Sequence, residues 1–371
     1  MIVKNFHIND IIFNTFLLSP NINKFNEISI RNIKKKLLIN NKLYYINNNL
    51  HIFIAVKHVN WEKPALVDSW KHFGTVIHYD WGNTYNQYDK DWHKIGKKLF
   101  NQELLKKIKD IHKKNPINIF FSYFSGRLVF PKTIEEINNL GIITINIGFD
   151  DTSTFWGIKE PTGYSGNVEI APYYDISITC QNPKDIYKYL HVGGRPIYMP
   201  PAANPNVFAN LDSSTNKSMQ ICFIGQNYGK RIKIINYLKS KKIPIIIRGK
   251  GWPEGPVTIN KMVEMFSNSL LVLGFGYIKN TKITGLKARD FEVPMTGTAY
   301  ITTFNKTLKN YFTPDKEILF YKNEKHLLNK IKYYLNNPKL AISIGIKGKK
   351  RALRDHTWTK RWEFILEIIG N

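Results

Sequence analysis

The stretch TGLKARDFEVPMTGTAYI, residues 284–301, decides the fold prediction. It opens as a polar loop and continues into a short charged and apolar segment that suits a helix. A turn of small residues, Thr296-Gly297-Thr298, then leads into the β-prone run from Ala299 to Thr303. We therefore predict a loop, a short helix, a turn and a buried strand, in that order.

The charges of the same stretch have the pattern of an anion site. Lys287 and Arg289 come just before the acidic pair Asp290 and Glu292. A helix N-terminus flanked by Lys and Arg favours phosphate, and a carboxylate one turn later can accept hydrogen bonds from sugar hydroxyls. Together they could hold a nucleoside diphosphate and its ribose. The alternatives are a solvated helix face and a pairing of one cation with Asp290.

Apolar strands alternate with helical segments on both sides of a polar stretch, ANLDSSTNKS (209–218). The first series starts with HIFIAVKHV at His51, and the second starts with MQICFIG at Met219. Strands that alternate with helices predict a parallel sheet, and the polar stretch predicts a linker. We expect an N-terminal domain, a linker, a C-terminal domain and a last helical segment, at residues 1–208, 209–218, 219–354 and 355–371.

Glycines follow or end several strand candidates of the second series, at Gly225, Gly249 and Gly276. Ligands bind outside the carboxyl ends of parallel strands, and glycine lets a ligand approach the backbone closely. We expect these glycines at the ligand-facing edge. Trp252, which follows Gly249, could stack on a base or sugar, or could anchor its loop in the core.

The net charge indicates the kind of partner. The chain of 371 residues has 54 Lys and Arg against 28 Asp and Glu, a net charge of +26. Such a surface attracts anionic membranes, nucleic acid or phosphorylated substrates. An Asn-, Ile- and Lys-rich composition explains part of this excess but not the scarcity of acids. The basic runs NIKKKLLINNK, KKIKDIHKK, KSKK and KGKKR are usually solvated faces, unless they converge in the fold.

Other classes are disfavoured by the sequence. The longest apolar runs, such as 270–275, are far too short to cross a bilayer. The start, MIVKNFHINDIIF, lacks the uninterrupted apolar core of a signal peptide, so we expect a cytoplasmic protein that could bind a membrane peripherally. Cys180 and Cys222 lie in apolar runs typical of buried thiols. The histidines lack metal-ligand spacing, so no metal site is expected.

Several segments of the C-terminal half share their order and spacing with one known family. These are CFIGQNYGKR (222–231), IRGKGWPEG (247–255), LKARDFEVPMTGTAYIT (286–302), YFTPDKEILFY (311–321) and RALRDHTWTKRW (351–362). They resemble the spore-maturation CgeB-like glycosyltransferases, a group 1 type family with the GT-B fold. The N-terminal half matches more loosely, through NIGFDD (146–151) and MPPAANPNVF (199–208).

The resemblance implies an α/β fold of two Rossmann-like domains that face each other across a cleft. The N-terminal domain would bind the acceptor and the C-terminal domain a nucleotide-sugar donor, while the last helix would cross back to the N-terminal domain. A hexose or pentose would be transferred without a metal or other cofactor. The implied donor-binding residues are Gly225, Lys230, Arg231, Gly249, Trp252, Lys287, Arg289 and, on the ribose, Glu292. Many retaining relatives carry another glutamate where this chain has Thr284, which leaves the stereochemistry open.

Candidate acceptor-side residues lie in the N-terminal half. Asp150 and Asp151 end the strand-like run IITINIGFDD, and a carboxylate there could act as the base for an acceptor hydroxyl. We rank Asp151 slightly above Asp150, and the alternative is a helix cap or turn. Arg127 follows IFFSYF and could meet an anionic acceptor, while His78 near a strand end could contact the acceptor. Both could equally be ordinary polar residues.

The leading hypothesis is a glycosyltransferase that acts on a surface-glycan or lipid-linked acceptor at an anionic membrane face. The first alternative is a DNA-modifying glycosyltransferase of the phage type, whose acceptor is a modified base in duplex DNA. The second is a non-catalytic nucleic-acid-binding or glycan-binding protein on the same fold. The sequence gives no prediction of oligomeric state.

Overall fold

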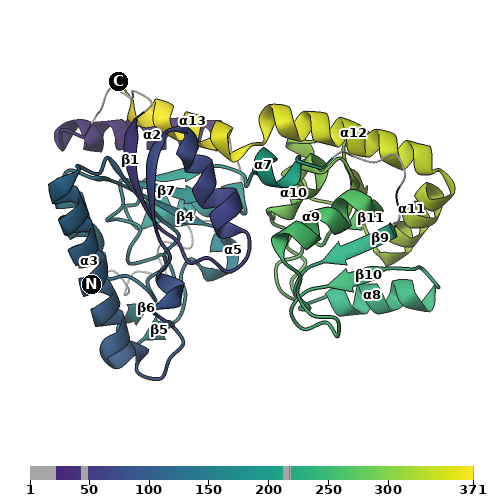
Figure 1. The fold of residues 1–371 in the computed structure, drawn as a ribbon, viewed down its shortest axis with the longest axis horizontal. Helices are drawn as coiled ribbons and strands as arrows, with labels where there is room; N and C mark the ends of the chain where they lie inside the picture. Colours follow the sequence, from purple (N-terminus) through teal and green to yellow (C-terminus); the bar gives the residue numbers. More distant parts are fainter. Residues whose placement is uncertain (1–21, 43–48, 212–216, 218, 371) are drawn as a thin grey trace. The chain divides into compact units, whose positions relative to one another are not determined.

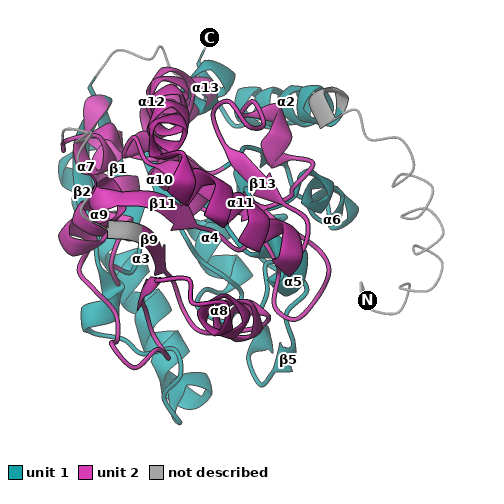
Figure 2. Cartoon of the chain, turned by 90° about the vertical axis from the view of Figure 1, so that its right-hand side faces the viewer, with its two compact units in different colours: residues 1–57, 73–200, 365–371 teal, residues 58–72, 201–364 magenta. Residues whose placement is uncertain are grey.

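The computed structural model describes residues 22–42, 49–211, 217 and 219–370, and it divides the chain into two compact units (Figures 1 and 2). Unit 1 consists of the described parts of 1–57, 73–200 and 365–371. Unit 2 consists of 58–72 and the described parts of 201–364. The chain therefore passes between the units more than once, so the units are not two consecutive halves of the sequence.

Unit 1 is built on a six-stranded sheet in the order β2-β1-β3-β4-β7-β8, with every neighbouring pair parallel. The strands are β1 (Leu50–Ala55), β2 (Gly74–Tyr79), β3 (Ile119–Ser122), β4 (Ile143–Gly148), β7 (Ile176–Thr179) and β8 (Pro196–Tyr198). A small antiparallel hairpin joins β5 (Lys159–Glu160) to β6 (Gly163–Tyr164). The helices are α2 (Ile22–Ile39), α3 (Lys97–Lys114), α4 (Pro131–Asn139), α5 (Asp151–Thr154) and α6 (Ile186–His191), with short turns η4 (Trp81–Asn83), η5 (Trp92–Gly96) and η6 (Pro183–Asp185).

Unit 2 is built on a five-stranded parallel sheet in the order β10-β9-β11-β12-β13. The strands are β9 (Met219–Ile224), β10 (Ile246–Arg248), β11 (Ser269–Leu273), β12 (Ala299–Thr303) and β13 (Leu319–Tyr321). The helices and short turns are α7 (Pro205–Phe208), α8 (Arg231–Ser240), α9 (Ile259–Asn268), α10 (Arg289–Met295), α11 (Glu324–Asn336), α12 (Pro338–Asp355), α13 (Trp358–Ile369), η2 (Glu62–Val67), η3 (Asp68–His72) and η7 (Leu308–Asn310).

Both sheets have the strand order of doubly wound folds. The chain reverses direction across the sheet beside β1 in unit 1 and beside β9 in unit 2. In such sheets the loop at the reversal is the preferred ligand position. The predicted α/β class with two parallel sheets is confirmed, and Gly225 directly follows β9 at this reversal in unit 2.

Apolar strands alternate their side chains between two packed faces of the unit 2 sheet. Phe223, Leu273 and Ile301 point into a core cluster that α8 and α11 also fill. Tyr300 points to the opposite face, where its hydroxyl contacts Asp290 of α10. Because successive side chains of a strand point to opposite faces, β12 packs on one face and supports α10 on the other.

The stretch 284–301 folds as its pattern predicts. It passes through a loop, α10, a turn and the buried strand β12. Gly297 has φ of +83°, a left-handed conformation that glycine adopts without strain, so it ends the helix and turns the chain toward β12.

The unit boundaries differ from the predicted domain boundaries. The longer part of unit 2 starts at Pro201, inside the predicted first domain, and most of the predicted linker 209–218 lies outside the described residues. Residues 58–72, which we placed in the first domain, belong to unit 2, where the Trp70 ring stacks on that of Trp362 with centroids 4.4 Å apart. Helix α13 runs from unit 2 into unit 1, with the division between Phe364 and Ile365.

Candidate functional site

The loops that follow β9 and β10 are in direct contact. The Gly225 N–H donates to the carbonyl of Arg248 at 2.8 Å. Gly249 has φ of +136°, and a Cβ there would lie 2.3 Å from the carbonyl oxygen of Gly225. A Cβ on Gly225 would lie 3.2 Å from Nη1 of Arg289. Both glycines are therefore required by packing, and Gly225 brings bare backbone next to the Arg289 guanidinium.

Trp252 fixes this pair of loops from inside the core. Its indole N–H donates to the Gly225 carbonyl at 2.8 Å, and its ring packs edge-on against Phe223 with centroids 6.2 Å apart. Only 8% of the side chain is exposed. The structure thus places Trp252 as the anchor of the loop, and its burial leaves no free ring face for a base.

Arg231, at the start of α8, is also used within the protein. Its guanidinium donates to the Gln226 carbonyl at 2.7 Å and to the Tyr228 hydroxyl at 3.0 Å, and it lies 3.9 Å from the Tyr228 ring centroid. Burial lowers the pKa of Arg231. The Lys230 ammonium lies 4.6 Å from the Tyr277 ring centroid. Arg231 therefore shapes the loop after Gly225, and Lys230 is half-buried beside it.

Arg289 has no anionic partner among the residues that the structure describes. It contacts the sulfur of Met262 at 3.8 Å, and its buried Nε has no hydrogen bond. Helix α10, which it begins, has only seven residues, so its dipole is weak. The Arg289 guanidinium is thus a positive group next to Gly225 that makes no salt bridge to any described residue.

Asp290 does not pair with the side chain of Arg289. Its carboxylate accepts from the Lys287 N–H at 2.8 Å and from the Tyr300 hydroxyl at 3.0 Å. Burial raises its pKa to about 6. A Cβ on Gly274 would lie 2.0 Å from the Tyr300 hydroxyl, so glycine leaves room for this bond. These contacts of Asp290 and Tyr300 fix the start of α10. We did not predict them from the sequence, although Gly274 directly after β11 indicates a close approach of another group.

Glu292 is buried without a hydrogen-bond partner among the described residues, and only 4% of it is exposed. Burial raises its pKa to about 7, and the charge of Arg289 opposes this shift, while Asp290 and Glu62 add to it. A buried carboxylate without a donor is costly. Groups of this kind concentrate at ligand sites.

The carboxylates predicted as bases in unit 1 have contrasting environments. Asp151 is 1% exposed, and it accepts from Asn167 Nδ2 and from the Tyr189 hydroxyl, both at 2.9 Å. Burial, with a contribution from Asp185, raises its pKa to about 6. Asp150 is exposed and accepts from Gln181 at 3.1 Å. Asp151 is therefore held inside unit 1, whereas Asp150 is open to solvent, and the role of either carboxylate as a base stays a prediction.

The acceptor-side cation and histidine are engaged within unit 1. Arg127 forms an ion pair with Glu160, and its guanidinium carbon lies 5.3 Å from the Tyr88 ring centroid. The Nε2 of His78 lies 2.8 Å from the carbonyl of Val56. Both side chains are half-buried. These contacts give each of them a structural role.

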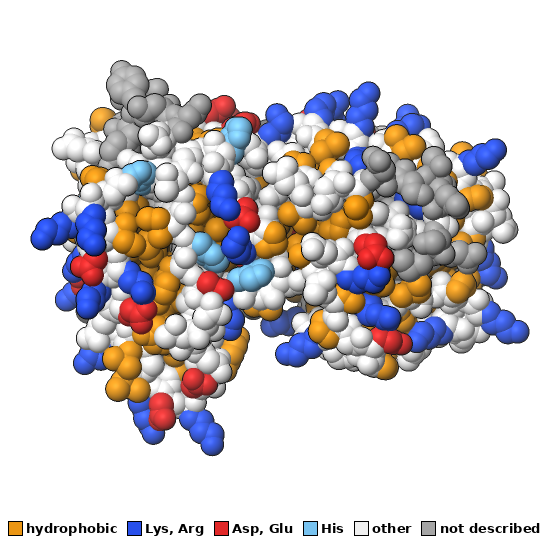
Figure 3. Space-filling view, in the orientation of Figure 1, with side chains coloured by type: hydrophobic (Ala, Val, Ile, Leu, Met, Phe, Trp, Pro, Cys, Tyr) orange, Lys and Arg blue, Asp and Glu red, His pale blue; other side chains and the backbone are white. Residues whose placement is uncertain are grey.

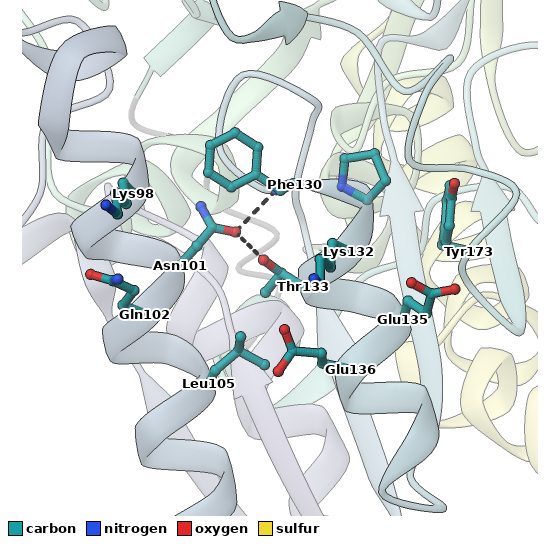
Figure 4. A pocket seen from close by; sticks show the side chains of 11 residues that line it. Lys98, Asn101, Gln102, Leu105, Phe130, Lys132, Thr133, Glu135, Glu136 and Tyr173 are labelled. Atoms are coloured by element: carbon teal, nitrogen blue, oxygen red, sulfur yellow. Dashed lines mark hydrogen bonds between the residues drawn. The ribbon is translucent and has the colours of Figure 1, made fainter.

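An open groove of about 740 Å³ lies between α3 and α4 of unit 1 (Figure 4). At its floor, Asn101 Oδ1 accepts from the Phe130 N–H at 3.0 Å and from the Thr133 hydroxyl at 2.7 Å, which secures the start of α4. None of the predicted site residues lines it. We assign the groove no part in the site.

The basic residues do not form one patch on the face drawn in Figure 3. Lys and Arg side chains are scattered there over both units, with acidic and apolar side chains between them. Within the described residues, no helix has the length and apolar character to cross a bilayer, and no His, Cys, Asp and Glu side chains group as a metal site.

The chain is similar to known glycosyltransferases in sequence and in fold. Residues 231–367 match the family described as glycosyl transferase-like. Three similar solved structures are a glycosyltransferase from Rickettsia africae (11% identity, TM-score 0.60, 87% of this chain and 100% of that one), sucrose-phosphate synthase from Thermosynechococcus elongatus (12%, 0.56, 85% and 98%) and Anabaena HepE in complex with UDP-glucose (9%, 0.53, 85% and 99%).

These structures establish the fold over most of the chain. No curated protein matches the sequence. The matched region runs from the start of α8 into α13, and it includes Arg289 and Glu292. The GT-B-type α/β fold that the resemblance implies is confirmed, and residues 231–367 match the glycosyl transferase-like family.

Proposed function

We propose that this protein is a glycosyltransferase whose unit 2 binds a nucleotide-sugar donor by its diphosphate and its ribose. One observation carries the proposal. Arg289 and Glu292 are largely withdrawn from water, and neither makes a hydrogen bond or salt bridge to a group of opposite charge among the described residues. Both belong to the start of α10, beside Gly225 at the edge of the sheet where ligands bind. A ligand with an anionic part and a hydroxylated part would satisfy both.

The diphosphate would lie beside Gly225. Arg289 presents a planar guanidinium that suits two phosphate oxygens, and the missing side chain of Gly225 leaves the backbone open next to it. Glu292 would accept hydrogen bonds from the two ribose hydroxyls. The similar structure of Anabaena HepE was solved with UDP-glucose, which supports a donor of this class.

In the proposed reaction, an acceptor oxygen attacks the anomeric carbon of the sugar. The bond from that carbon to the diphosphate oxygen breaks, and the nucleoside diphosphate leaves. Arg289 would stabilise its developing charge, so the proposal assigns this task to the protein rather than to a metal ion. The acceptor proton would pass to a carboxylate, for which Asp151 and Asp150 are the predicted candidates. Activity in excess EDTA tests the metal-independent part.

The net charge of +26 supports an anionic acceptor environment. We propose a surface-glycan or lipid-linked acceptor at an anionic membrane face, with duplex DNA that carries a modified base as the alternative. Sugar incorporation into lipid-linked acceptors on vesicles would support the first. Salt-dependent binding to duplex DNA together with sugar incorporation into it would support the second.

The experiment is a binding screen with UDP, GDP, ADP, CDP and dTDP and their glucose conjugates. A ligand that binds the folded protein raises its melting temperature. For the best ligand we expect Arg289→Met to weaken binding about 100-fold, because charge-assisted hydrogen bonds are worth about 1.5–3 kcal/mol each. Arg354→Met, at an exposed arginine of the same unit, is the matched control and should leave affinity unchanged. No binding across the panel would contradict the proposal.

A further inference from the structure

The segment 58–72 brings a second buried glutamate into unit 2, where it is coloured with that unit in Figure 2. Glu62 begins η2 and is 9% exposed. Asn204 Nδ2 donates to the carbonyl of Pro64 at 2.8 Å, and the Trp362 indole N–H donates to the Ser69 hydroxyl at 2.7 Å. The segment that carries Glu62 is thus fastened to unit 2 at two points.

These two hydrogen bonds hold the segment of Glu62 on the part of unit 2 that contains Glu292. Asn204, which holds Pro64, is also the N-cap of α7, and α7 packs against α10, the helix of Glu292. The charge of Glu62 acts on Glu292 and contributes to its raised pKa. Local patterns do not predict this neighbour, since Glu62 and Glu292 lie more than two hundred positions apart.

The carboxylate of Glu62 is held on one side and open on the other. Its Oε2 accepts from the N–H groups of Val59 and Asn60, both at 2.9 Å. Its Oε1 accepts no hydrogen bond from any other residue that the structure describes. The nearby His58 Nδ1 accepts from the Lys63 N–H at 3.3 Å and lies 3.7 Å from Glu62 Oε2, on the held side of the carboxylate.

We propose that Glu62 binds hydroxyl groups of the sugar that the donor transfers, while Glu292 binds its ribose. This inference rests on the proposed function, because it assigns the sugar end of that same donor. Two like-charged carboxylates repel each other at close range unless donors lie between or beside them. A nucleotide sugar carries a hydroxylated ring on each side of its diphosphate, so it supplies such donors to both glutamates. Glu62 is therefore a specificity-determining residue for the sugar.

The test compares a nucleoside diphosphate with its sugar conjugate, for example UDP with UDP-glucose or whichever pair of the screen binds best. Calorimetry should show that Glu62→Gln weakens the conjugate about 10-fold or more, since a hydrogen bond to a charged group is worth about 1.5–3 kcal/mol. Affinity for the diphosphate alone should change less than about twofold. Glu292→Gln should weaken both ligands. Glu264→Gln, at an exposed glutamate of unit 2, is the control.

Deoxy-sugar donors test the same assignment in a second way, because they remove the hydroxyl instead of the carboxylate. Wild-type protein should lose affinity for at least one conjugate that lacks a single hydroxyl, and Glu62→Gln should not discriminate against that conjugate. Equal losses for diphosphate and conjugate, or no loss for either, would overturn the role of Glu62 and leave the donor site intact. A wild-type protein that binds no diphosphate at all would overturn the proposed function, and this inference with it.

Discussion

Buried charges are treated differently in the two units. In unit 1, Asp175 forms salt bridges with Lys36 at 2.9 Å and with Lys42 at 3.2 Å. The buried ammonium of Lys97 donates to the carbonyls of Gly126 and Thr162 at 2.7 and 3.0 Å. In unit 2, Arg289 and Glu292 have no such partners among the described residues.

The difference separates charges that hold the fold from charges that are kept for a ligand. A buried charge with its partners in place contributes to a unique structure, and loss of one partner is strongly destabilising. A buried charge without a partner lowers stability until a ligand supplies one. Asp290 shows that unit 2 also contains the first kind, next to the second.

The largest effect is expected from removing Asp175, the carboxylate of unit 1 that forms two salt bridges. Asp175→Ala leaves Lys42, which is 2% exposed, without a counter-charge. We expect a loss of about 3–5 kcal/mol of unfolding free energy, measured by urea denaturation, with no change in the nucleotide affinity of unit 2. Glu264→Ala, which breaks the exposed pair with Lys261, should cost less than about 1 kcal/mol. Equal effects of the two variants would contradict the comparison.

The second prediction concerns Glu292, which has no hydrogen-bond partner among the described residues, so its substitution is expected to raise stability rather than lower it. The pKa of Glu292 is about 7 in the folded protein and 4.5 in the unfolded chain. Its contribution to stability is therefore present below pH 4.5 and is lost as the pH rises through 7. Glu292→Gln imitates the protonated form, so it should stabilise the ligand-free protein at alkaline pH by up to about 3 kcal/mol.

The measurement is the difference between the unfolding free energies of wild type and Glu292→Gln from pH 5 to pH 8.5. Groups common to both proteins cancel in that difference, which should rise with pH and level off above pH 7. The same variant should bind nucleotide more weakly. A variant that is less stable than wild type at alkaline pH would show that Glu292 has a partner in the fold.

The smallest effect is expected at Trp252, whose indole holds the loop that follows β9. Trp252→Phe removes the hydrogen bond to the Gly225 carbonyl but keeps an aromatic ring in the core. We expect a loss of about 1 kcal/mol in stability and a few-fold loss in nucleotide affinity, because the backbone beside Arg289 is less well fixed. Thermal denaturation and calorimetry measure the two effects. Unchanged affinity would mean that the position of Gly225 does not depend on Trp252.

Local patterns predicted much of the fold. The alternation of strands and helices gave two parallel sheets, and the stretch 284–301 gave α10 and β12 in the right order. They could not place the segment 58–72, because its assignment to unit 2 depends on the contact of Trp70 with Trp362, residues from opposite ends of the chain. The burial of Asp151 was missed for the same reason, since Asn167 and Tyr189 surround it from later segments.

Period, turn residues and charge order are local properties, so they predicted the fold class, the place of Gly225 directly after a strand and the cluster of charge around Glu292. Which of these charges have partners depends on the folded protein. The tertiary structure turned Arg231 and Trp252 into supports of a loop, and it left Arg289 and Glu292 without hydrogen-bonded protein partners of opposite charge among the described residues. It also brought the segment of Glu62 into the unit of Glu292, because burial and pairing arise from contacts between segments far apart along the chain.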